Sequence, residues 1–189
     1  MKPVHLRTVP PPQETFQHTE LFKLIFQFMK PYSYLELGVR WGGNLKELAP
    51  YCKQAVGVDF AYSLVTEKMP DNVKYFNMST DDFFKTLEKG VMFDAVFIDA
   101  DHSFEQSLKD FENVKDRVIE DGLIFFHDTY PSSEEYINPN QCGDVYKTAL
   151  YIKQNYIDEF EIMTLPFNPG VTIIKKMKRN KQLYYRDEK

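Results

Sequence analysis

The chain has 189 residues, 43% of them apolar and 15% aromatic, which is enough for one domain with a buried core. Its net charge of −5 and pI near 5.4 argue against nucleic-acid binding, which usually needs a basic face. No stretch of about 20 apolar residues could span a bilayer, and the N-terminus has no apolar signal core. We therefore expect a soluble, cytoplasmic protein whose two cysteines, Cys52 and Cys142, are reduced, with no nucleic-acid or membrane partner.

The first half of the chain alternates predicted helices and short apolar strands. Apolar residues recur at helical spacing over 13–30, and Pro31 ends that helix. The segments that follow are a strand over 34–39, a helix over 44–51, a strand over 55–60, a short helix within 61–71, a strand over 73–77 and a helix up to about 89. Ser79 or Thr80 is expected to cap that last helix.

The second half continues the alternation and then closes on a hairpin. A nearly continuous apolar strand over 93–99 has the character of a buried parallel strand. Apolar positions from Phe104 to Val118 then recur at helical spacing, and Asp121-Gly122 is expected to end that helix. The remaining segments are a strand over 123–126, a loop over 129–143, a helix to about 155, and strands over 160–166 and 171–176 around a turn at 168–170.

The order of these elements predicts an α/β protein. Five strand–helix alternations imply a Rossmann-like, doubly wound and mostly parallel sheet with helices on both faces, a three-layer α/β/α sandwich. The C-terminal antiparallel β-hairpin implies that one strand enters antiparallel. We expect a single domain over 1–189, with a leader over 1–12 and a tail over 178–189 as flexible ends.

The turn after the first strand carries the clearest functional signal. It reads Tyr34-Leu-Glu-Leu-Gly-Val-Arg-Trp-Gly-Gly43, with an acid two residues before a glycine and a glycine pair after it. Asp59 ends the second strand, where the ribose hydroxyls of a bound nucleoside would lie. Together the two features predict a nucleoside-containing cofactor.

This turn resembles motif one of the class I S-adenosylmethionine-dependent methyltransferases, Glu-x-Gly-x-x-x-Gly, with Glu36, Gly38 and Gly42 in its three fixed places. The resemblance extends over 13–177, because the antiparallel terminal hairpin also marks that family. It implies S-adenosyl-L-methionine as the cofactor. This cofactor has no phosphate, so a full Gly-x-Gly-x-x-Gly cradle for a pyrophosphate is not needed.

The resemblance also implies roles for individual residues. Glu36 would orient the methionyl part, Gly38 would allow close backbone approach, and Asp59 would accept both ribose hydroxyls. The three residues that leave the third strand would border the adenine: Met78, Ser79 and Thr80.

Polar side chains also follow the fourth and fifth strands, in the segments Ile98-Asp-Ala-Asp-His102 and Phe126-His-Asp-Thr129. Because carboxyl ends of adjacent parallel strands meet at one edge of a sheet, these groups should converge beside the cofactor. Asp99 is therefore expected to border the cofactor as well. The simpler explanation for Asp99 and Asp101 is negative charge at a helix N-terminus.

This second group resembles the metal-dependent small-molecule O-methyltransferases, and more narrowly their branch that acts on sugars and natural products. The resemblance implies a divalent metal, Mg²⁺ or Mn²⁺, held by Asp99, His127 and Asp128. It implies Asp101 as the candidate base, with His102 as its rival, and a hydroxylated small molecule as the methyl acceptor. An ion bound there would acidify the acceptor hydroxyl.

One residue departs from that pattern. Many metal-dependent relatives have a carboxylate where this chain has His127. Mg²⁺ prefers oxygen ligands, whereas imidazole suits Mn²⁺, Fe²⁺ or Zn²⁺ better. His127 is therefore a ligand of a softer ion, a general base in a metal-free site, or a satisfied core histidine. His5 and His18, which lie in the leader and the first helix, carry no functional signal.

Two alternatives stand beside an O-methyltransferase. A nicotinamide-dependent oxidoreductase shares the strand–turn–helix start, but the chain lacks Gly-x-Gly-x-x-Gly and ends on a hairpin. The second alternative is a non-catalytic protein that binds the cofactor and acts as a partner, since little sequence lies outside the minimal fold to build a substrate pocket. A homodimer could complete that pocket. The loop over 129–143 should lie over its mouth, with Tyr136 as a cover.

Overall fold

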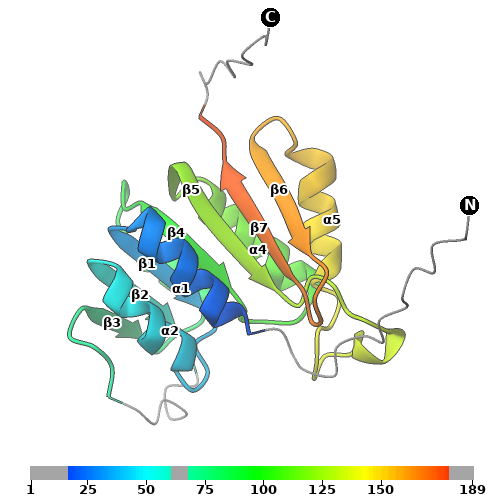
Figure 1. Cartoon of the computed structure of the whole chain (residues 1–189), viewed down its shortest axis with the longest axis horizontal. Helices are drawn as coiled ribbons and strands as arrows, with labels where there is room; N and C mark the ends of the chain where they lie inside the picture. Colours follow the sequence, from blue (N-terminus) through cyan, green and yellow to red (C-terminus); the bar gives the residue numbers. More distant parts are fainter. Residues whose placement is uncertain (1–16, 61–67, 179–189) are drawn as a thin grey trace, which may run out of the picture.

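The computed structural model describes residues 17–60 and 68–178 (Figure 1). The leader, the start of the short helix expected within 61–71 and nearly all of the tail lie outside these residues. The strands form one sheet in the order β3-β2-β1-β4-β5-β7-β6. Their bounds are β1 Ser33–Leu37, β2 Gln54–Val58, β3 Val73–Phe76, β4 Phe93–Ile98, β5 Val118–His127, β6 Phe160–Leu165 and β7 Val171–Lys176.

The strand directions confirm the predicted sheet. Strands β1 to β5 pair parallel, and only β7 pairs antiparallel with its neighbours β5 and β6 among the described residues. The α-helices between the strands are α1 His18–Met29, α2 Gly43–Leu48, α3 Thr80–Thr86, α4 Phe104–Lys115 and α5 Tyr146–Asn155. Short 3₁₀ turns lie at η1 Ala49–Tyr51 and η3 Glu134–Tyr136.

The helices cover both faces of the sheet, which gives the expected three layers. Figure 1 shows α1 and α2 in front of the strands and α4 and α5 behind them. On the first face Phe22 and Phe26 of α1 pack with Leu45 of α2 in one apolar cluster. On the other face Phe83 of α3 and Phe111 of α4 belong to a second cluster, together with Ile152 of α5. Adjacent residues of a strand serve opposite clusters, as the period of two requires.

The region around Asp121-Gly122 differs from the sequence prediction. Helix α4 ends at Lys115, so Val118 starts β5 and does not extend the helix. Asp121 has a left-handed backbone with φ 63°, and the pairing of β4 with β5 shifts register here. A Cβ on Gly122 would lie 2.6 Å from the Val118 side chain, so only glycine fits. Asp121-Gly122 is thus an irregularity inside a long strand.

The topology brings five loops to one edge of the sheet. Because β1 to β5 are parallel, the segments that leave β1, β2, β3, β4 and β5 all start at their carboxyl ends. Val171 of the antiparallel β7 pairs with His127 at the end of β5, so the turn before β7 reaches the same edge. This edge is where open α/β sheets bind ligands.

Candidate active site

A cavity of about 560 Å³ opens at the carboxyl edge of the sheet. Its lining comes from the segments after β1, β2, β4 and β5, from the loop around Tyr136 and from Asn168-Pro169 before β7. A second cavity of about 220 Å³ adjoins it and shares Gly38 and Asp59. The combined space is in the size range of small-molecule and cofactor sites.

The turn after β1 is shaped by the close approach of the β4 end. Gly38 has φ 87°, and a Cβ there would lie 2.1 Å from the carbonyl oxygen of Asp99. This residue must therefore be glycine for the two strand ends to meet. Gly42 also has a positive φ, 85°, as the N-cap of α2, but it is not among the residues that line either of the two cavities. Its structural role is to start the helix.

Glu36 lines the larger cavity and is buried, with 1% of its surface exposed. The Tyr34 hydroxyl donates to Oε2 of Glu36 at 2.6 Å, and the Asn44 amide donates to the same oxygen at 2.8 Å. Burial raises the pKa of Glu36 to about 8, although both hydrogen bonds oppose that rise. The carboxyl group predicted for the methionyl part is therefore held in place by two hydrogen bonds, and burial favours its neutral form.

Asp59 follows β2 and lines both cavities. Its Oδ2 accepts hydrogen bonds from the backbone amides of Val39 at 2.9 Å and Arg40 at 2.7 Å. The carboxylate thus binds the first turn as well as facing the proposed ribose position. Sequence reasoning anticipated the position of Asp59 but not this structural contact.

The residues predicted to border the adenine line the smaller cavity. Met78, Ser79 and Thr80 all lie there. Ser79 is also the N-cap of α3, because its hydroxyl accepts from the backbone amide of Asp82 at 3.1 Å. Thr80 is buried and accepts a hydrogen bond from the Gln106 amide at 3.2 Å. Gln106, which lines the same cavity, was not anticipated from the sequence.

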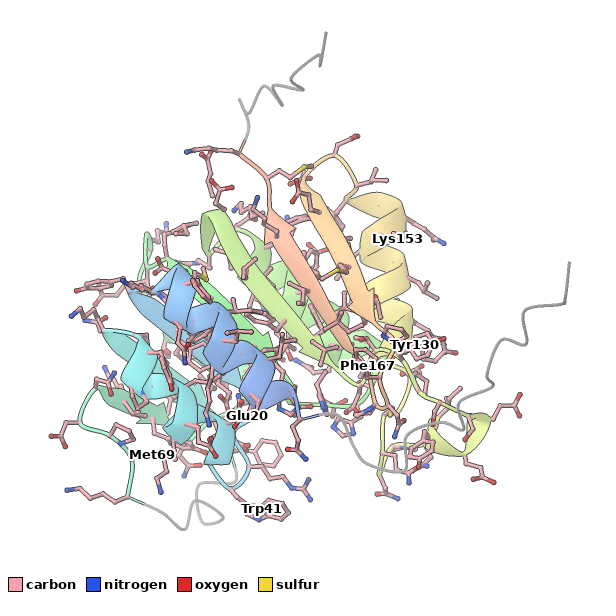
Figure 2. The ribbon with its side chains drawn as sticks, viewed as in Figure 1. Glu20, Trp41, Met69, Tyr130, Lys153 and Phe167 are labelled. Carbon is pink, nitrogen blue, oxygen red and sulfur yellow. The ribbon has the colours of Figure 1, made fainter. Side chains whose placement is uncertain are left out.

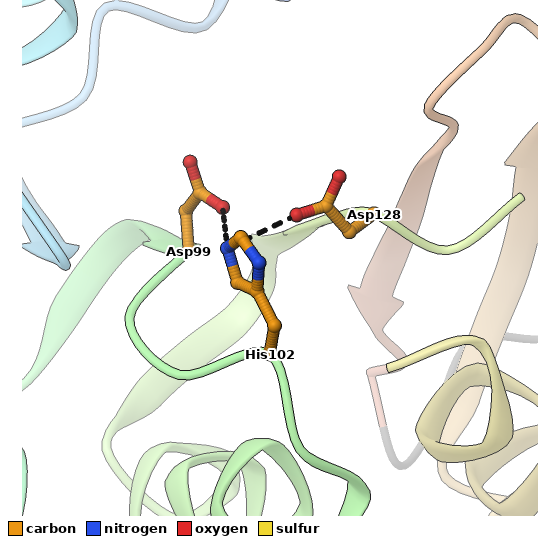
Figure 3. Close-up of side chains that lie close together, drawn as sticks. All are labelled: Asp99, His102 and Asp128. Atoms are coloured by element: carbon orange, nitrogen blue, oxygen red, sulfur yellow. Dashed lines mark ion pairs between the residues drawn. The ribbon is translucent and has the colours of Figure 1, made fainter. Parts of the chain in front are cut away.

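The polar residues after β4 and β5 converge in the larger cavity (Figure 3). Nε2 of His102 lies 3.2 Å from Oδ2 of Asp128 and 3.8 Å from Oδ1 of Asp99. Nδ1 of His127 lies 3.3 Å from one oxygen of each of these acids. Two carboxylates and two imidazoles therefore form one cluster, as the sequence predicted for Asp99, His127 and Asp128.

The charges within this cluster shift the pKa of its members. Burial disfavours the charged form of His127, but Asp99 and Asp128 outweigh burial and raise the pKa of His127 to about 10. Burial would raise the pKa of Asp99, yet the neighbouring imidazoles, His127 first, outweigh it and lower that pKa. Asp128 occupies a left-handed backbone with φ 59°, a conformation that Asp tolerates better than most residues.

Asp101 and His102 are placed differently. Asp101 is exposed, and its Oδ1 accepts from the backbone amide of Ser103 at 2.8 Å. It lines the smaller cavity and not the one that holds Asp99. His102 turns into the larger cavity and contacts both acids. The structure therefore brings His102, and not Asp101, to the acidic cluster.

Three further residues of the cavity region were missed by sequence reasoning. The ring of His18, at the start of α1, lies 4.5 Å from that of His127 in an edge contact, and burial lowers the pKa of His18 to about 4. Cys142 lines the cavity, and burial first and Asp128 second raise the pKa of its thiol to about 12. Asn168 also lines it, with a buried Oδ1 that lacks a hydrogen-bond partner. No spacing pattern links these residues to the cluster.

The loop and Tyr136 expected at the cavity mouth both lie there. The 129–143 loop lies over the mouth, since Tyr136 lines it with Asn140 and Gln141. Trp41, in the turn after β1, lines neither of the two cavities. It is 56% exposed and projects from the surface (Figure 2), with the Arg40 guanidinium 4.0 Å above its ring.

The donor set of the cluster is compatible with a divalent metal. Asp99, His102 and Asp128 each offer one ligand atom, and these atoms lie within 4.8 Å of one another. The nearby Nδ1 of His127 is a further nitrogen donor. Two carboxylates with imidazole nitrogen suit an ion that accepts mixed oxygen and nitrogen ligands, such as Mn²⁺ or Zn²⁺, better than Mg²⁺.

Comparisons with known proteins place the chain in a family. Residues 25–129, more than half of the chain, match the family model described as a methyltransferase domain. No curated protein matches the sequence.

Within the described residues, no helix is both long and apolar enough to cross a membrane.

Solved structures share the fold at low sequence identity. The O-methyltransferase TomG from Streptomyces achromogenes, solved with SAM, has a TM-score of 0.68 at 13% identity, over 85% of this chain and 80% of that one. An O-methyltransferase from Bacillus cereus, in complex with SAH, has a TM-score of 0.67 at 16% identity, over 88% and 84%. A putative caffeoyl-CoA O-methyltransferase from Staphylococcus aureus has a TM-score of 0.70 at 14% identity, over 88% and 86%.

Proposed function

Because the chain belongs to the methyltransferase-domain family, we propose that it binds S-adenosyl-L-methionine and transfers the methyl group to a hydroxyl of a small molecule. The acceptor class is sugar-like or natural-product-like. The observation that carries the proposal is that the two groups of residues meet in one cavity at the carboxyl edge of the sheet. Residues suited to a nucleoside, Glu36, Gly38 and Asp59, line a cavity that also holds Asp99, His102 and Asp128.

The cofactor half of the site suits a cationic nucleoside. Asp59 offers a carboxylate where the ribose diol would lie, and Met78 offers an apolar surface to the adenine. Glu36 lines the larger cavity, and its carboxylate would stabilise the cationic amino group of the methionyl part. These contacts support S-adenosyl-L-methionine over NAD, since the turn after β1 lacks the Gly-x-Gly-x-x-Gly that cradles a pyrophosphate.

The acid–imidazole cluster suits the activation of a hydroxyl. An alcohol has a pKa near 16 and a phenol one near 10, so either is a poor nucleophile at neutral pH. In the proposed reaction the hydroxyl oxygen bonds to the methyl carbon as the bond from carbon to sulfur breaks, and S-adenosylhomocysteine leaves. The hydroxyl proton passes to His102, whose position beside Asp128 stabilises the imidazolium. Proximity and alignment of the reactants supply much of the acceleration.

A metal is the second way in which this cluster could activate the acceptor. Asp99 and Asp128 would hold the ion together with an imidazole, from His127 as the family resemblance implies or from His102. When bound, such an ion would acidify the acceptor hydroxyl and fix its position. The roles of Glu36, Asp59 and the adenine-side residues are the same with or without it.

Calorimetric titration with S-adenosylhomocysteine and, separately, with NAD tests the cofactor assignment. We expect binding of S-adenosylhomocysteine and none of NAD. A panel of hydroxylated sugars and phenols with labelled S-adenosyl-L-methionine then tests the transfer, with and without a chelator. Binding of NAD instead would support the oxidoreductase. Tight cofactor binding without transfer to any acceptor would support a non-catalytic partner protein.

A further inference from the structure

The buried carboxyl group of Glu36 belongs to a chain of hydrogen bonds that links three elements. Thr19 of α1 donates to Oδ1 of Asn44 at 3.0 Å. The amide of Asn44, in α2, donates to Oε2 of Glu36 at 2.8 Å and to the Tyr34 hydroxyl at 3.0 Å. The Tyr34 hydroxyl donates to the same Oε2 at 2.6 Å. Both side-chain bonds therefore go to one carboxyl oxygen and fix its direction.

This arrangement holds an acid where water cannot solvate it. Tyr34 is fully buried and Glu36 is 1% exposed, although Glu36 lines the cavity. A buried carboxylate without a nearby cation is costly. The hydrogen bonds from Tyr34 and Asn44 offset only part of that cost, and the pKa of Glu36 accordingly stays near 8. A cationic ligand that enters the cavity would supply the missing charge.

The groups that face Glu36 do not cancel the rise in its pKa. On its own strand the titratable neighbour is the Tyr34 phenol, whose pKa lies well above its ordinary value because of burial and of Glu36 itself. From β4 the facing group is the Asp99 carboxylate, which raises the pKa of Glu36 further. Helix α2 presents the neutral amide of Asn44 and the backbone amide of Leu45. The residue paired with Glu36 on β2 is Gly57, which has no side chain.

We propose that Tyr34 and Asn44 are positioning residues that fix the direction of the Glu36 carboxyl group, that burial keeps this group a neutral acid in the ligand-free protein, and that entry of the cationic amino group of the cofactor expels its proton. Cofactor binding is thereby coupled to the release of a proton. The inference rests on the proposed function, since it needs a ligand with a cationic group at this end of the cavity.

The direction of the pH effect follows from the charge. The cation prefers the ionised carboxylate, so the bound state favours Glu36 without its proton. Below about pH 8 the ligand-free protein must lose a proton to bind, so cofactor affinity should rise by up to about tenfold per pH unit, with a smaller rise as pH nears 8. Above that pH the gain should level off. Below that pH proton release should accompany cofactor binding, and it should fall as pH rises.

Titration calorimetry with S-adenosylhomocysteine, in buffers of different ionisation enthalpy between about pH 6 and 9, measures this proton count and the pH at which affinity levels off, without turnover. The ligand keeps the cationic amino group and cannot react. Glu36→Gln should bind about tenfold more weakly at pH 8 and should lose the Glu36 share of the proton count. Tyr34→Phe removes a bond that favours the carboxylate, so its affinity should level off at a higher pH than in the natural protein.

A matched control pair lies outside the two cavities. Tyr156 donates to Glu112 in a similar partly buried pair that lines neither of the two cavities of the active site. Tyr156→Phe should keep the natural proton count and pH profile. Equal proton counts for the natural protein and Glu36→Gln would overturn the inference, and so would an unchanged profile in Tyr34→Phe. If S-adenosylhomocysteine does not bind the natural protein at any pH, the proposed function falls and this inference falls with it.

Discussion

Single residues at the edge of the sheet serve both the fold and the proposed chemistry. Asp59 holds the amides of Val39 and Arg40 and also faces both cavities. Ser79 caps α3 while it lines the adenine side. A substitution at such a residue changes stability and binding together, so variants must be chosen to separate the two effects.

Asp59 can be tested with two substitutions. Asp59→Ala should weaken S-adenosylhomocysteine binding at least tenfold, about 1.4 kcal/mol, and should also lower the melting temperature because it leaves the amides of the turn without their acceptor. Asp59→Asn should keep most of the stability, since its amide oxygen can still accept from the turn. It should still lose affinity, because one acceptor replaces two. Unchanged affinity in both variants would remove the ribose assignment.

His102 and Asp101 provide a second test at this scale. His102→Asn should reduce methyl transfer by about 10²-fold or more, the usual loss when a general base is removed, while the affinity for S-adenosylhomocysteine stays near normal. Asp101→Asn is the matched control, because Asp101 lies outside the acidic cluster. The two rates, measured with an acceptor from the hydroxyl panel, should differ strongly. A larger loss in Asp101→Asn would reverse the assignment.

At the scale of elements, the close approach of the strand ends after β1 and β4 sets the geometry of the site. The backbone of Asp99 occupies the space where a side chain on Gly38 would begin. The same approach brings the Asp99 carboxylate to the cavity that Glu36 lines. The glycine of the first motif thus fixes the distance between the cofactor half and the reacting half of the site.

A pair of glycine substitutions tests this packing. Gly38→Ala places a Cβ 2.1 Å from the Asp99 carbonyl at a φ of 87°, so we expect a loss of about 2 kcal/mol or more in the free energy of unfolding. Gly43→Ala, at the start of α2, has no atom within 4 Å of the new Cβ and should be neutral or slightly stabilising. Urea denaturation compares the two. Equal stability of both variants would contradict the close approach.

Across the whole molecule, the sequence predicted the features that periodicity and strand ends encode. The sheet, its antiparallel hairpin and the convergence of Asp99, His127 and Asp128 all follow from apolar spacing and from the residues at strand ends. The irregularity at Asp121-Gly122 could not be predicted in this way, because a glycine after a helical pattern usually signals the end of a helix.

Contacts that depend on tertiary packing could not be predicted from the sequence either. His18 reaches His127 only because α1 packs across the sheet with Phe22 against Phe97 and Phe125. The choice between Asp101 and His102 depended on the direction of two neighbouring side chains at the start of a helix. The hydrogen bonds from Tyr34 and Asn44 to Glu36 depend on the way in which β1 and α2 meet.

The most direct test of the central claim is a crystal structure of the protein with S-adenosylhomocysteine and Mn²⁺. The account predicts the ribose beside Asp59, the amino group near Glu36, and the sulfur facing the cluster of Asp99, His102 and Asp128. A nucleoside bound elsewhere on the molecule, or one whose sulfur points away from these three side chains, would contradict it.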